Sequence, residues 1–160
     1  MFNVIDATTR YIIQHEGFVD GVYEDTMASQ DYAKKHGYWS DKHKKYVLAT
    51  AGHGFTDPKD LHPWTREGAY KRAREIVVNI DDHLRKIIPN YDELPENKQG
   101  ALIDLGYQGG LRVLDKMPKL KAALLRNDPD AGKYLGYGAK QTPTRNRDRI
   151  ALWNNPTEYR

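Results

Sequence analysis

The chain has 160 residues, with 25 Lys and Arg against 22 Asp and Glu and no cysteine. This length suits one compact domain or two closely joined lobes with a buried core, and the lack of cysteine excludes disulfides and thiolate metal sites. No run approaches the ~20 apolar residues of a membrane span, and the first residues form neither a basic leader nor an uninterrupted apolar stretch.

The first part of the chain predicts a helix followed by two strands. Apolar residues from Asn3 to His15 have helical spacing, and Gly17 is a typical helix end. Residues 18–26 alternate as a strand does, and residues 46–55, YVLATAGHGF, combine a strand-like composition with the glycines of a tight turn. The intervening segment, 27–45, is polar, basic and aromatic without a clear period, so we interpret it as a surface insertion.

The longest predicted helix starts after Thr65, a good N-cap, and ends before Pro89. Its apolar residues recur every three or four positions, and a helix of this length spans ~35 Å, enough to link two lobes. Shorter helical segments follow, most of them starting at proline. We expect them at 95–105, around Val113 and Leu114, and at 118–126, 129–135 and 143–153.

Two acidic residues stand where they can converge on one site. Glu16 leaves a helix among apolar residues, a setting in which a carboxylic acid tends to keep its proton and can act as a general acid. Asp25 follows nine residues later in a polar setting and is expected to stay ionised. Strand alternation places Tyr23 and Asp25 on one face and Glu24 on the other. Thr50 offers a hydroxyl that can orient a water molecule.

Five motifs along the chain resemble, in order, those of the phage-type lysozymes, the endolysins that cut peptidoglycan. A Glu-Gly pair ends the first helix, a Tyr-x-Asp follows nine residues after the Glu, and a Thr-x-Gly-x-Gly comes next. Two later segments are similar to the family's cleft helix and its closing Arg-rich helix. The matching residues are Glu16-Gly17, Tyr23-Glu24-Asp25, Thr50-Ala51-Gly52-His53-Gly54, ALIDLGYQGG (101–110) and KQTPTRNRDRIALW (140–153).

This resemblance implies an α+β, predominantly helical, lysozyme-like fold over the whole chain, 1–160. A small β-containing lobe would occupy about 12–64 with the insertion at 27–45, a connecting helix 65–88, and a helical lobe 89–160. It also implies a muramidase that cleaves the β-1,4 bond between N-acetylmuramic acid and N-acetylglucosamine by inversion. Glu16 would be the acid, while Asp25 and Thr50 would hold the attacking water.

Further positions follow from the same resemblance. Gln108, Gln141 and Thr142 match residues that contact saccharide or peptide in the family, although capping of helix ends explains each of them equally well. The 24 residues between Asp25 and Thr50 exceed the family's short hairpin, so Thr26 is an alternative to Thr50.

Histidine is placed differently from the family. Phe55 stands where the family often carries a histidine, and His53 lies two positions earlier, so a supporting role of His53 stays open. A zinc cluster of His36, His43, His53 and His62 is disfavoured, because their spacing matches no closed zinc pattern. We expect no metal and no cofactor.

Two other functions stay open. A lytic transglycosylase uses one acid and no activated water, which Asp25 and Thr50 disfavour. A non-enzymatic module could bind a polyanion or the cell wall through the basic C-terminal half of the chain. Residues 112–149 contain ten Lys and Arg against four Asp and Glu, and Tyr107, Tyr134 and Tyr137 could stack on bases in the same half. Taken singly, the acids at 16 and 25 would be ordinary surface or turn residues. Taken together they favour the hydrolase, a monomer acting on bacterial peptidoglycan, with no nucleic acid and no membrane span. We expect it to be made in the host cytoplasm and to reach the cell wall after release.

Overall fold

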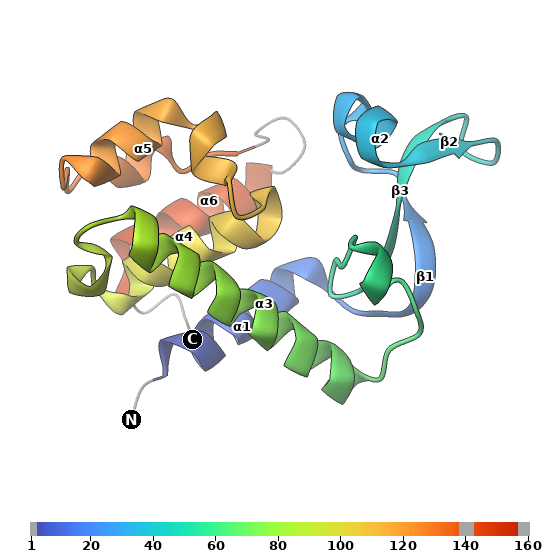
Figure 1. Ribbon diagram of the computed structural model, residues 1–160, viewed down its shortest axis with the longest axis horizontal. Coiled ribbons are helices and arrows are strands. Elements are labelled where there is room, and N and C mark those ends of the chain that lie inside the picture. The colour runs from blue at the N-terminus through green and yellow to red at the C-terminus, as the bar shows by residue number, and fades with distance from the viewer. Residues whose placement is uncertain (1–2, 138–142, 157–160) are drawn as a thin grey trace. The chain divides into compact units, whose positions relative to one another are not determined.

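The computed structural model describes residues 3–137 and 143–156 of the chain. Those residues form a mixed α and β structure with a small antiparallel sheet and mostly helical remainder, which confirms the predicted α+β class (Figure 1). The helices are α1 (Val4–Glu16), α2 (Gln30–His36), α3 (Arg66–Ile87), α4 (Glu96–Gly109), α5 (Pro118–Leu125) and α6 (Pro143–Asn154). The strands are β1 (Val19–Asp25), β2 (Tyr38–Ser40) and β3 (Lys45–Gly52).

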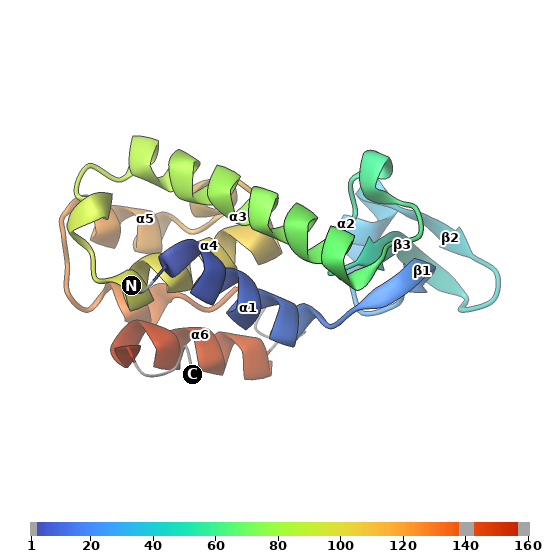
Figure 2. The same cartoon turned by 90° about the horizontal axis from the view of Figure 1, so that it is seen from below.

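The chain divides into two compact units. The sheet unit is Ile13–Ala73 and contains all three strands; the helical unit is Met1–Ile12 with Arg74–Arg160. Two helices contribute residues to both units. The last turn of α1 belongs to the sheet unit, as does the first part of α3, a helix of 22 residues (Figure 2).

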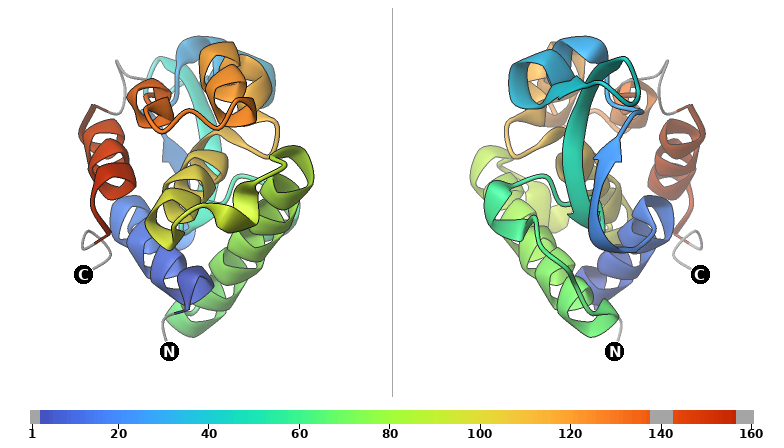
Figure 3. Two further views of the ribbon diagram at one scale, coloured as in Figure 1. Left: turned by 90° about the vertical axis from the view of Figure 1, so that its left-hand side faces the viewer. Right: turned by 90° about the vertical axis from the view of Figure 1, so that its right-hand side faces the viewer.

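The sheet has the strand order β1-β3-β2, and both pairings are antiparallel. Figure 3 shows β1 beside β3. In the β1–β3 ladder, Tyr23 lies opposite Thr50 and Glu24 lies opposite Ala49. Because residues directly opposite each other point to the same side of a sheet, Tyr23, Asp25 and Thr50 share one face, here called the Tyr23 face. Glu24 lies on the other face, as strand alternation predicts.

The segment 27–45 contains regular structure that the sequence pattern did not predict. Ser29 caps the start of α2 by accepting from the backbone N–H of Tyr32, and Gly37 follows its last turn. A Cβ on Gly37 would lie 1.9 Å from the carbonyl oxygen of Val47, so only glycine allows α2 to lead into β2 here. One residue of α2, Ala33, is fully buried. The helix escaped prediction because its seven residues bury only that one side chain.

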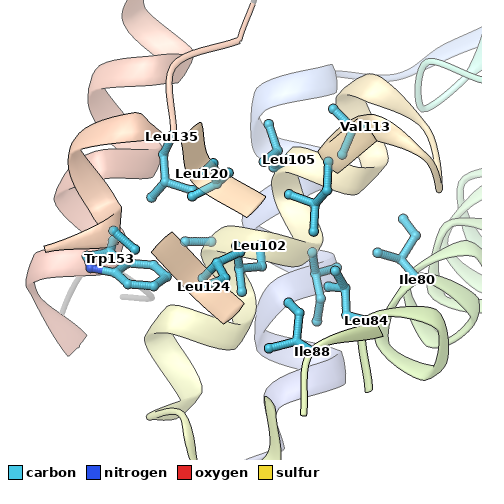
Figure 4. Close-up of a cluster of buried hydrophobic side chains, with 14 of the residues drawn as sticks. Ile80, Leu84, Ile88, Leu102, Leu105, Val113, Leu120, Leu124, Leu135 and Trp153 are labelled. Atoms are coloured by element: carbon cyan, nitrogen blue, oxygen red, sulfur yellow. The ribbon is translucent and has the colours of Figure 1, made fainter. Parts of the chain in front are cut away.

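The helical unit has one hydrophobic core, drawn in Figure 4. The predicted apolar stripe of α3 supplies one wall of it through Val77, Ile80 and Leu84. Each fully buried aliphatic side chain of this size contributes about 1.5–3 kcal/mol. The opposing side chains come from α4, α5, α6 and the short helical turns between them: Leu102, Leu105, Val113, Leu120, Leu124, Leu135 and Trp153.

The predicted helix starts are confirmed more closely than the ends. Thr65 accepts a 3.0 Å hydrogen bond from the N–H of Gly68 and so caps α3, while Pro118 and Pro143 are the first residues of α5 and α6. In contrast, α4 continues four residues beyond its predicted end, to Gly109. The segment predicted as a helix at 129–135 is a single 3₁₀ turn, Ala131–Tyr134.

A buried ion network joins α4 to α6 within the helical unit. Arg149 donates from Nε to Asp104 at 2.8 Å, and Arg145 donates to the other carboxylate oxygen at 2.7 Å. Both Asp104 and Arg149 are completely buried. Burial by itself would raise the pKa of Asp104, but the charges and hydrogen bonds of Arg145 and Arg149 lower it overall. A depressed folded-state pKa means that this stabilisation is present above about pH 4 and is lost as the pH falls below it.

We therefore predict that Asp104→Asn lowers the free energy of unfolding by about 3–5 kcal/mol, because it leaves the charge of Arg149 buried without its counter-ion. Asp115→Asn is the matched control, since Asp115 pairs with Arg112 and Lys121 at the surface and an exposed pair contributes about 0–1 kcal/mol. Urea unfolding at neutral pH measures both values. Equal losses in the two variants would show that the buried network is not a major stabilising element.

Candidate functional site

Glu16 is the last residue of α1, and the chain leaves the helix through Gly17. The N–H of Gly17 still bonds to the carbonyl of Ile13 at 2.9 Å, but the residue itself adopts φ +72°. Glycine takes this left-handed conformation without the steric cost that other residues carry, so it ends the helix directly after Glu16. The half-buried side chain of Glu16 is thus fixed at a helix end.

His53 ties this helix end to the turn that follows β3. Its Nδ1 lies 2.6 Å from the carbonyl oxygen of Gly17. A carbonyl can only accept, so Nδ1 carries the proton and donates. The ring is almost fully buried, with its centroid 5.4 Å from that of Phe18 and 6.2 Å from that of Phe55. The sequence left open whether His53 has a supporting role. In the structure His53 holds the backbone next to Glu16.

Gly54 brings the same turn into contact with the Glu16 carboxyl group. Gly54 has φ +77°, and a Cβ at this position would lie 2.3 Å from Oε2 of Glu16. The carboxyl group therefore lies directly against the Cα of Gly54, in space that a side chain would fill. Both the backbone angle and the available room restrict position 54 to glycine.

Asp25 and Thr50 lie on the Tyr23 face of the sheet. Asp25 ends β1, and its Oδ1 accepts a 2.8 Å bond from the N–H of Met27, as an aspartate in a turn commonly does. Oδ2 has no hydrogen-bond partner among the described residues. Thr50 is only 2% exposed, and its hydroxyl makes one long bond of 3.3 Å to the carbonyl of Leu48.

The negative charges of both acids act on Tyr23. Its pKa is raised above the ordinary value, first by burial and then by the negative charges of Asp25 and Glu16. A phenol with a raised pKa stays protonated at neutral pH and can donate a hydrogen bond. The sequence placed Tyr23 in a motif but gave it no role, because its proximity to both carboxylates depends on how α1 meets β1.

Glu24 is engaged on the opposite face of the sheet. It accepts a 3.0 Å bond from the hydroxyl of Ser40 and lies 3.7 Å from Nε2 of His43. A hydrogen bond from the hydroxyl of Tyr38 lowers the pKa of Glu24. These contacts join β1 to β2 and to the turn that follows it, so Glu24 stabilises the sheet.

Of the three residues predicted to contact substrate, the structure describes Gln108. Gln108, near the end of α4 in the helical unit, accepts a hydrogen bond from Arg149 through its amide oxygen. This contact extends the buried ion network of that unit. Gln141 and Thr142 lie outside the described residues.

In the described parts of the basic segment, 112–137 and 143–149, several basic side chains are paired with carboxylates. Arg145 and Arg149 bind the buried Asp104, and Arg112 and Lys121 share Asp115. The three tyrosines proposed as stacking surfaces all pack partly against the hydrophobic core of the helical unit: Tyr107, Tyr134 and Tyr137.

The four histidines considered for zinc have separate surroundings. His36 stacks on Tyr32 with ring centroids 4.4 Å apart, and His62 lies 2.8 Å from the carbonyl oxygen of Pro63. Within residues 3–137 and 143–156, no group of three or more His, Cys, Asp or Glu side chains could hold a metal ion. Over the same residues, every helix is too short or too polar to cross a bilayer.

Comparison with known proteins adds no assignment to this geometry. The chain matches no protein-family model, and it matches no curated protein.

We predict that Gly54→Ala lowers the free energy of unfolding by about 1–3 kcal/mol, because alanine is strained at φ +77° and its methyl group displaces the Glu16 carboxyl. Gly21→Ala is the matched control, since nothing lies within 4 Å of a Cβ there and its φ is not positive. Thermal unfolding measures stability, and the NMR shift of the Glu16 side chain reports its displacement. An unmoved Glu16 in the Gly54 variant would contradict the proposed contact.

Proposed function

We propose that the protein is a peptidoglycan muramidase, a lysozyme-like endolysin that hydrolyses the β-1,4 bond between N-acetylmuramic acid and N-acetylglucosamine. The observation that carries the proposal is that the Glu16 carboxyl lies against Gly54, in the turn after β3, while Asp25 lies on β1, the strand that pairs with β3. These two carboxyl groups come from different elements, a helix end and a strand end. Two carboxyl groups in different environments are what hydrolysis of a glycosidic bond requires.

Glu16 is the proposed general acid. Its carboxyl lies against the Cα of Gly54, and the end of its helix is held by the bond from His53 to Gly17. A fixed acid can deliver its proton to the glycosidic oxygen as the bond to the sugar breaks, without first searching for the right geometry. Rigid support of this kind is what a general acid needs.

Asp25 is the proposed base, with Thr50 as the group that orients the water. Oδ1 of Asp25 is engaged with the N–H of Met27, so Oδ2 is the atom available to accept a proton from water. The Thr50 hydroxyl lies on the same face of the sheet. In inversion the water attacks from the side opposite the leaving group, and the two carboxyl groups stand roughly 6.5–9.5 Å apart to accommodate it.

One experiment separates the three candidate functions. Purified peptidoglycan is incubated with the protein while turbidity is followed, and the soluble products are analysed by mass spectrometry. New reducing ends identify a muramidase. Anhydro-muramic ends identify a lytic transglycosylase, and binding without soluble product identifies a non-enzymatic wall-binding module.

We predict that Glu16→Gln reduces the initial rate of peptidoglycan clearing by about 100-fold or more, because the amide keeps the shape of the side chain but cannot donate the proton. Asp25→Asn should be severely impaired as well. Glu24→Gln is the matched control and should stay close to wild type, because Glu24 lies on the opposite face with Ser40 and His43. A Glu16→Gln variant that folds normally and retains more than a tenth of the activity would contradict the assignment of the acid.

Inversion gives a second, independent prediction. Attack of water opposite to the leaving group of a β-linked sugar releases the α-anomer first. Proton NMR of a fresh hydrolysate, recorded before mutarotation, should therefore show the α-anomeric signal rising ahead of the β signal. An initial β product would instead require a retaining mechanism with two successive displacements.

A further inference from the structure

The edge of β3 that faces β2 is interrupted at one residue. Alternate residues of a strand direct their N–H and C=O groups to the same edge. Ala51 exchanges both of its backbone hydrogen bonds with Phe55, at 3.0 and 2.8 Å, on the side of β3 away from β1. Val47, four residues earlier, lies opposite Tyr38 of β2 on that same side. Ala49, midway between them, therefore also directs its N–H and C=O to this edge.

No residue in the described part of the chain pairs with Ala49 on that edge. β2 pairs only with residues 45–47 of β3, and the bridge to Phe55 involves only Ala51. The pairing of Ala49 with Glu24 is on the β1 side. Among the described residues, the N–H and the C=O of Ala49 are thus left without a partner at a break in the sheet edge.

A pocket of about 560 Å³ lies at this break. Its volume is in the range of roughly 300–1,000 Å³ that is typical of small-molecule sites. One wall comes from α2 and the start of β2, and the other from the chain that follows the bridge to Phe55. The lining residues are Tyr32, His36, Gly37, Tyr38, Leu48, Ala49, Thr56, Asp57, Pro58 and Leu61.

The lining specifies the chemistry of a ligand. It contains no Lys or Arg and one carboxylate, so it does not suit an anion. Tyr32 and Tyr38 are 43% and 45% exposed, which leaves ring surface for a flat apolar ligand face. Oδ1 of Asp57 accepts from the N–H of Lys59 at 3.2 Å, and Oδ2 can accept from a hydroxyl group. The remaining requirement is one amide group, to match the N–H and C=O of Ala49.

The protein already uses such an amide on the other edge of the same strand. Beyond the end of β1, the side chain of Gln30 donates to the carbonyl of Tyr46 at 3.0 Å and accepts from its N–H at 3.0 Å. A single amide thereby replaces a missing strand at Tyr46. The same pairing at Ala49 needs an amide supplied from outside the chain.

We propose that this pocket binds the acetamido group of an N-acetylated amino sugar, with Ala49 as its hydrogen-bonding partner and the rings of Tyr32 and Tyr38 against the sugar. The proposal deepens the proposed function, and it rests on that function only for the source of the sugar, since both sugars of peptidoglycan carry an acetamido group. Neither Glu16 nor Asp25 lines this pocket. Four of its ten lining residues, Tyr32, His36, Gly37 and Tyr38, come from the segment 27–45, which gives that segment a role in holding the glycan.

An extended peptide fits the break less well than an acetamido group does. A peptide that adds to a sheet edge pairs with several alternate residues along the strand. Here β2 and the bridge to Phe55 occupy the positions on either side of Ala49, so the edge offers one residue only. An acetamido group carries one N–H and one C=O and needs no more than that.

The test is a titration of the full-length, ¹⁵N-labelled protein with N-acetylglucosamine, followed by NMR. We expect a saturable shift of the Ala49 amide signal, and no such shift with glucose, which lacks the acetamido group. An Ala49 amide that does not respond, or that responds equally to glucose, overturns the proposal. A response to N-acetylalanine methylamide without a response to the sugar overturns it in favour of a peptide site.

A pair of variants supports the assignment to this pocket. Tyr32→Ala should raise the Kd for N-acetylglucosamine roughly five- to tenfold, because it removes one ring from the lining. Trp39→Ala is the matched control: this ring is also exposed, but it lies opposite Tyr46 and does not line the pocket. Equal effects of both variants would place the sugar elsewhere.

The sugar titration tests the pocket and the peptidoglycan assay tests the proposed function, so either proposal can be overturned without the other. Sugar binding at Ala49 without cleavage of peptidoglycan overturns the proposed function and leaves the pocket as a sugar site. Cleavage of peptidoglycan without a shift of Ala49 overturns the pocket assignment and leaves the proposed function standing.

Discussion

The candidate site depends on one junction, where the end of α1 meets the turn after β3. His53 donates to the carbonyl of Gly17, and the Glu16 carboxyl lies against the Cα of Gly54. Both glycines adopt positive φ, so the helix stops and the turn closes at the positions that make this contact possible. Without the junction, Glu16 would extend from a helix end with no fixed relation to the sheet.

The sheet also determines the position of the second acid, Asp25. Because β1 pairs directly with β3, the strand that carries Asp25 is aligned with the strand that carries Thr50 and leads into the turn. The two faces of this sheet have separate tasks. The Tyr23 face carries the proposed catalytic groups, whereas Glu24 on the other face bonds to Ser40 and secures β2. Of these two adjacent carboxylates, Glu24 therefore stabilises the sheet, whereas Asp25 is the proposed base.

The two units are stabilised by different physical means. The helical unit has a continuous aliphatic core and a buried ion network centred on Asp104, whose charge is balanced by Arg145 and Arg149. The sheet unit relies on small residues, on rings in contact, such as Phe55 and Trp64 with centroids 5.2 Å apart, and on the 3.0 Å ion pair of the buried Asp60 with the partly exposed Arg72. A sheet of three strands, one of only three residues, needs such local support.

The sequence by itself determined the elements whose signals are local. Helical spacing and a Thr65 cap defined α3, glycine ended α1, and strand alternation separated Asp25 from Glu24, because each of these signals acts within a few residues of the chain. Only the tertiary structure decided the contacts between distant segments. The approach of Gly54 to Glu16, the bond from His53 to Gly17 and the break in the sheet edge all join residues whose meeting depends on chain folding. The helix α2 was missed for the same reason, since its short length carries little periodic signal and its burial against β3 is a tertiary event.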